Sequence, residues 1–121
     1  MDEDDHVDEE MLADVLGLLE DEAAQGILKA CDLFRSSVPE RLDDIGSALH
    51  DGRFDDAAQA SHSLRGSAGA FGAKRLSALS VRIEELCRES DAAGASAVLE
   101  DMRSEFLVYR DILDARLARF R

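Results

Sequence analysis

The chain has 121 residues, of which 45% are hydrophobic, and this is enough for one compact domain with a single core. Aromatic residues make up 5% and there is one proline, whereas helix-forming Ala, Leu, Glu and Arg are abundant, so the composition favours an all-α fold. The formal net charge of -13 repels phosphate backbones and anionic lipids, which argues against nucleic acid and membrane surfaces as partners.

The two cysteines, Cys31 and Cys87, lie far apart, and neither has a second Cys or His at metal-ligand spacing. Both fall on apolar helix faces, so we expect them to be small buried hydrophobic residues. No N-terminal signal-peptide pattern is present, and no apolar run approaches the length of about 18 residues that spans a bilayer. These features predict a soluble, cytoplasmic protein.

The N-terminus is strongly acidic, with seven acids in the first ten residues and almost no apolar side chain. Such a segment buries too little surface to offset its ordering entropy, so we expect residues 1–7 to form a disordered tail, with His6 a tail residue, and residues 8–121 to form the single domain. Apolar residues at helical spacing then predict a short accessory helix from Glu9 to about Glu20.

Four longer amphipathic helices follow. Apolar residues repeat at intervals of three and four, and helix-ending glycines separate the repeats. Pro39 lies inside the first of these helices, where we expect a kink because the apolar stripe continues in register beyond it. The predicted helices run from about Ala23 to Leu49, from Phe54 to between Gly69 and Gly72, from Ala73 to Glu89, and from a turn at Ser90–Gly94 to the C-terminus.

Short connections make consecutive helices antiparallel, so we predict an up-and-down four-helix bundle with the short N-terminal helix attached at one end. The chain contains no phosphate-binding loop, no dinucleotide-binding glycine motif, no zinc-binding helix motif and no serine nucleophile elbow. We therefore expect no cofactor, no metal and no ATP site of its own.

The chemistry-bearing segment is residues 54–73, FDDAAQASHSLRGSAGAFGA. On a helical wheel, Leu64 and Ala68 point away from His62, which places the core on one side and the imidazole in solvent. Gly66 and Gly69 fall within about 40° of His62, and each helical glycine costs about 0.8–1.0 kcal/mol relative to alanine. The two glycines are explained if another protein must approach the imidazole closely, since neither has a side chain to block it.

Neutral imidazole is a competent nucleophile near pH 7, and in-line phosphoryl transfer needs an uncrowded approach to the attacking nitrogen. Arg65, one turn along, is placed to stabilise charge on phosphoryl oxygens. Ser67 is a candidate hydrogen-bond donor, and Gln59 is a candidate for orienting the ring or the phosphoryl group.

The pattern H-x-L-R-G-S-x-x-x-x-G-A, carried by His62, Leu64, Arg65, Gly66, Ser67, Gly72 and Ala73, resembles the signature of histidine-containing phosphotransfer domains. The resemblance covers most of the chain, since that family is a four-helix bundle with an accessory N-terminal helix. It implies that His62 accepts a phosphoryl group from a receiver-domain aspartate or a histidine kinase and passes it to another receiver domain. The family usually has lysine where this chain has Arg65, which keeps the positive charge but presents a planar fork.

The implied partners are the receiver domain of a response regulator, a hybrid histidine kinase, or both, and an exposed active helix suits a monomer that carries phosphoryl groups without being an enzyme. Two other interpretations stay open: a bundle that docks a partner without chemistry, and the phosphoacceptor domain of a larger chemotaxis-type kinase. Replacing His62 with Gln separates the first from a phosphotransfer protein, since a pure adaptor would keep its activity.

Overall fold

The computed structural model describes residues 2–20 and 24–120. Two short helices, α1 and α2, precede four long ones, α3 to α6, and single 3-10 turns follow α2 and α6. In chain order the elements are α1 (Glu3–His6), α2 (Glu9–Gly17), η1 (Leu18–Glu20), α3 (Ala24–His50), α4 (Phe54–Ala70), α5 (Lys74–Arg88), α6 (Ala92–Leu117) and η2 (Ala118–Phe120).

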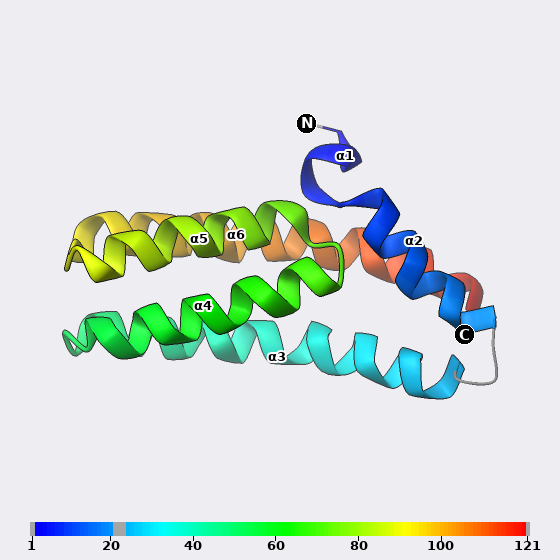
Figure 1. The fold of residues 1–121 in the computed structure, drawn as a ribbon, viewed down its shortest axis with the longest axis horizontal. Coiled ribbons are helices and arrows are strands. Elements are labelled where there is room, and N and C mark those ends of the chain that lie inside the picture. Colours follow the sequence, from blue (N-terminus) through cyan, green and yellow to red (C-terminus); the bar gives the residue numbers. More distant parts are fainter. Residues whose placement is uncertain (1, 21–23, 121) are drawn as a thin grey trace.

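The four long helices form the predicted antiparallel bundle. Each packs on its neighbours in chain order, and α3 also packs on α6, so the bundle closes on itself (Figure 1). The short segment α2 lies across one end of the bundle, near the C-terminus. This confirms the all-α, up-and-down architecture with an accessory N-terminal helix.

The predicted helix boundaries agree with the structure to within a few residues. Helix α5 begins and ends one residue inside its predicted limits, and α6 begins at Ala92, where the Asp91 side chain accepts a hydrogen bond from the Gly94 amide at 2.8 Å. Helix α3 continues through Pro39, as the unbroken apolar stripe predicts. Its predicted start at Ala23 lies outside the described residues.

The core is built from the inward stripes of all four helices, together with the accessory segment. Cys31 and Cys87 are both buried thiols within it, as expected. Tyr109 of α6 is buried, with its ring edge-on to Phe34 at 5.9 Å, and its hydroxyl donates to the Phe71 carbonyl at 2.6 Å. Phe34 stacks on Phe71 at 4.6 Å, so these rings join α3, α6 and the turn after α4.

The N-terminus differs from the prediction. Instead of a disordered tail, Glu3–His6 forms a helical turn, and both His6 and Val7 are buried. The His6 Nδ1 atom lies 2.8 Å from Oε1 of Glu105, a buried carboxylate on α6, and Arg75 of α5 lies 3.4 Å from the same oxygen. Composition alone could not predict this contact, because Glu105 is distant from His6 in sequence.

Among residues 2–20 and 24–120, none of the helices combines the length and apolar character that crossing a bilayer requires.

Candidate phosphotransfer site

His62 lies in the middle of α4 on the solvent face. Its side chain is 48% exposed, whereas Leu64 and Ala68 on the opposite side of the helix are completely buried. The helical-wheel prediction of a buried face opposite an exposed imidazole is therefore correct. The bundle supplies a rigid base for a side chain that other molecules can reach.

The ring of His62 is held by a carboxylate from the next helix. The Nδ1 atom lies 3.0 Å from Oε1 of Glu84 on α5, and Arg88, one turn further along, donates to the other oxygen of Glu84 at 3.0 and 3.2 Å. Burial would raise the pKa of Glu84, but the hydrogen bonds from Arg88 and His62 outweigh it and lower the pKa below its usual value. An ionised carboxylate only accepts hydrogen bonds, so this contact requires a proton on Nδ1, and in the neutral ring Nε2 then has a free lone pair.

Gly66 leaves open space one turn from His62. A Cβ atom built at Gly66 would meet no atom within 4 Å, and the residue is exposed. At Gly69 the same atom would lie 3.7 Å from the Ser77 hydroxyl of α5, an ordinary contact, and the residue is half-buried. The open part of the face is thus at Gly66, while Gly69 lies where α4 approaches α5.

The remaining candidate residues surround this face in different ways. Arg65 is half-buried and Gln59 is exposed, both on α4. Ser67 instead faces α3, where its hydroxyl accepts a hydrogen bond from Nη1 of Arg41 at 3.0 Å and lies within hydrogen-bond distance of the carbonyls of Ser63 and Leu64. The structure therefore adds Arg41 to the cations beside the site.

Glu84 and Arg88 were not predicted as site residues, although the sequence contains a signal for them. In an antiparallel hairpin, residues equally far on either side of the turn face each other. Ala73 is at the turn between α4 and α5, and Glu84 follows it by as many residues as His62 precedes it. Counting the same number of residues after the predicted turn as His62 lies before it would have identified Glu84.

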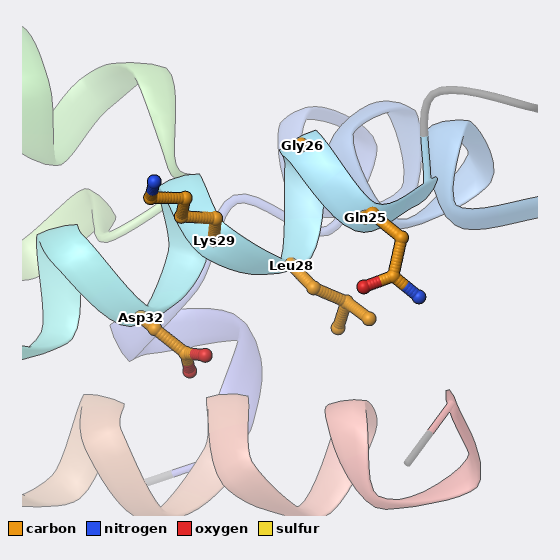
Figure 2. A pocket seen from close by; sticks show the side chains of 5 residues that line it. All are labelled: Gln25, Gly26, Leu28, Lys29 and Asp32. Atoms are coloured by element: carbon orange, nitrogen blue, oxygen red, sulfur yellow. The ribbon is translucent and has the colours of Figure 1, made fainter.

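A separate hollow lies at the start of α3 and has no part in this arrangement. Figure 2 shows Gln25, Gly26, Leu28, Lys29 and Asp32 around it, all from the first turns of that helix. None of these residues comes from α4 or α5, so the hollow shares no side chain with the His62 face.

Comparison with known proteins agrees with this geometry. The model of the Hpt domain family matches residues 29–120, which include all four long helices apart from the first turn of α3. The chain belongs to the Hpt domain family. A comparison with curated protein sequences returned no match.

Solved structures of Hpt proteins have the same fold. Histidine-containing phosphotransfer protein B of Pseudomonas aeruginosa is 28% identical, with a TM-score of 0.85 over 96% of this chain and 97% of that one. A maize histidine-containing phosphotransfer protein is 24% identical, with a TM-score of 0.83 over 98% of this chain and 87% of that one. As an Hpt domain, the chain is a histidine phosphotransfer protein of phosphorelay signalling, a class of phosphocarriers that partner with receiver domains.

Proposed function

We propose that Nε2 of His62 is the phosphoacceptor atom, which takes a phosphoryl group from a receiver-domain aspartyl phosphate or a histidine kinase and passes it to another receiver. The observation that carries this proposal is the geometry of the ring: Nδ1 is held by Glu84 at 3.0 Å, and the side chain is half exposed on a helix face that Gly66 leaves open. One nitrogen is therefore oriented and the other is available.

With an aspartyl phosphate as donor, the lone pair of Nε2 attacks the phosphorus atom. The N–P bond forms, the P–O bond to the aspartate breaks, and its electron pair returns to the carboxylate. Nδ1 keeps its proton, so no separate base is needed. The transfer needs the nitrogen, the phosphorus and the leaving oxygen nearly in line, and the open space at Gly66 provides that approach.

The cations near His62 suit a phosphoryl group in a chain of net charge -13. Arg65 follows His62 by one helical turn and presents a guanidinium to the phosphoryl oxygens, stabilising their charge during transfer. Ser67 and Arg41 form a hydrogen-bonded pair that contacts the incoming domain at the edge of the face. Gln59 is the hydrogen-bonding residue on the other side of the ring, and Gly69 lets α4 approach α5 closely.

A groove beside the site is the docking surface for the receiver domain. It is formed by α3 and the end of α4, and its apolar part includes Leu33, which is 59% exposed. Polar side chains border the groove, and one of them, Ser67, directly follows Gly66 in the chain. An apolar centre with a polar rim fits a modest, transient interface formed by a monomeric carrier.

The test is phosphorylation of the purified chain by a phosphorylated receiver protein, followed as acid-labile, base-stable phosphate. Wild type is expected to gain label and His62→Gln to gain none. Gly66→Leu is expected to be labelled roughly a hundredfold more slowly, because its side chain displaces the donor. Gly26→Leu is the matched control, since a Cβ at this helical glycine also meets open space, but far from His62.

Two outcomes would contradict the proposal. Label that persists in His62→Gln would move the acceptor to another side chain. Absence of label on wild type with several receivers and kinases would make the chain a docking module.

A further inference from the structure

The contact between His62 and Glu84 has a consequence for the phosphorylated protein that goes beyond orienting the ring. Glu84 is only 14% exposed, and its two oxygens are shared between His62 on one side and Arg88 on the other. Helix α5 therefore holds a fixed negative charge beside Nδ1. A phosphoryl group on Nε2 would leave this contact in place, since it occupies the opposite nitrogen.

The charged groups near the ring come from three helices. On α3 the group is Arg41, which donates to the Ser67 hydroxyl at 3.0 Å. On α5 they are Glu84, which contacts the ring, and Arg88, which donates to Glu84. On α4 itself the nearest charged side chain in sequence is Arg65. The His62 ring contacts the Glu84 carboxylate directly, whereas the Arg88 guanidinium is linked to the ring through that carboxylate.

The return step is faster when Nδ1 carries a proton. When a receiver carboxylate attacks the phosphorus, an O–P bond forms, the N–P bond breaks, and its electron pair goes to Nε2. If Nδ1 carries a proton, the ring leaves as neutral imidazole. If Nδ1 has lost it, the ring must leave as an imidazolate anion, which is a far poorer leaving group.

We propose that Glu84 is a positioning residue that keeps the proton on Nδ1 of phosphorylated His62, so that the phosphoryl group stays transferable at and above neutral pH. The carboxylate balances the positive charge that the protonated ring carries once Nε2 is bonded to phosphorus. Arg88 holds the carboxylate in place for this purpose. The inference rests on His62 being the phosphoacceptor.

The experiment compares wild type with Glu84→Gln, in which the amide oxygen can still accept the Nδ1 hydrogen bond but the charge is gone. Each protein is phosphorylated with phosphoramidate, a small phosphoryl donor, and freed of it. Transfer to one receiver protein, and loss of phosphate to water without the receiver, are then followed by 31P NMR across pH 6 to 10. Glu85→Gln is the matched control, since this neighbouring carboxylate points elsewhere and lies 4.0 Å from Arg82.

Both rates are expected to fall as the pH rises, and the pH at which each has fallen by half should be about one unit higher in wild type than in Glu84→Gln. Above both of these pH values the variant should therefore be roughly tenfold slower than wild type. Glu85→Gln should follow the wild-type profile. Equal midpoints in wild type and Glu84→Gln would overturn the inference while leaving His62 as the acceptor. Phosphate that does not reside on His62 would instead overturn the proposed function, which the His62→Gln protein reveals.

Discussion

Gly72, in the turn between α4 and α5, sets the alignment of the helices that carry His62 and Glu84. Its φ of +71° lies in the left-handed region that side chains other than glycine rarely adopt. A Cβ atom there would lie 3.0 Å from the Asp8 carbonyl oxygen and 3.1 Å from Leu12, because the accessory segment packs directly on the turn. The Gly72 carbonyl also accepts the Asp8 amide at 2.8 Å.

At the residue scale we predict that Gly72→Ala lowers the free energy of unfolding by about 2–4 kcal/mol. Left-handed strain contributes about 1–2 kcal/mol, and crowding against the accessory segment contributes the rest. Gly52→Ala separates the two effects, since Gly52 has a φ of +72° but open space at its Cβ position, and it should cost only the strain. Urea unfolding measures both, and equal losses would show that the packing on Gly72 contributes nothing.

At the scale of elements, the first helix is attached to the bundle by charge. Buried Glu105 of α6 lies within ion-pair distance of His6 and of Arg75. At the surface, Arg116 of α6 donates to Glu3 at 3.0 Å and to Glu9 at 2.9 Å, and its hydrogen bond lowers the pKa of Glu9. These contacts offset the low apolar content of the segment.

We predict that His6→Ala loosens α1 and costs about 1–3 kcal/mol, because the buried carboxylate of Glu105 loses one of its two partners, His6 and the exposed Arg75. Exchange of the Asp8 amide hydrogen, which bonds to Gly72, should become faster, while amides in the centre of α6 stay protected. His50→Ala, at the exposed end of α3, is the control and should change stability by less than about 0.5 kcal/mol. Unchanged exchange at Asp8 in His6→Ala would mean that the contact between His6 and Glu105 does not hold α1.

At the scale of the whole molecule, the bundle presents a polar surface of net negative charge with a few exposed apolar side chains. Leu33 of α3 belongs to the groove that borders Ser67, whereas Leu107, which is 49% exposed, is on α6. Helices α4 and α6 are diagonal in the bundle (Figure 1), so Leu107 lies away from α4, whereas Leu33 lines the groove beside Ser67.

Leu33→Ser is therefore expected to weaken receiver binding, raising the receiver concentration needed for half-maximal transfer by about tenfold. The rate at saturating receiver should stay the same, because the residue does not touch His62. Leu107→Ser, a substitution of the same kind on α6, should leave both values unchanged. If the two variants behave alike, the docking surface lies elsewhere.

Much of this molecule follows from local pattern in the sequence. Helix limits depend on apolar spacing and on the residues at helix ends, and these are near neighbours in the chain, so α4 and α5 are located to within a few residues. The exposure of His62 opposite Leu64 also follows, since both lie on one helix and its period places them on opposite faces.

Contacts between helices depended on the tertiary structure. The pairing of His62 with Glu84, of Ser67 with Arg41 and of His6 with Glu105 joins residues on different helices, and in an acidic chain many carboxylates compete for each position. The disordered N-terminus was predicted from the density of acidic residues alone, because composition does not show which distant side chains will contact them. The sequence by itself determined which residues form helices and which face of α4 meets solvent, whereas packing decided which charges meet, because only the closed bundle brings distant side chains within hydrogen-bond distance.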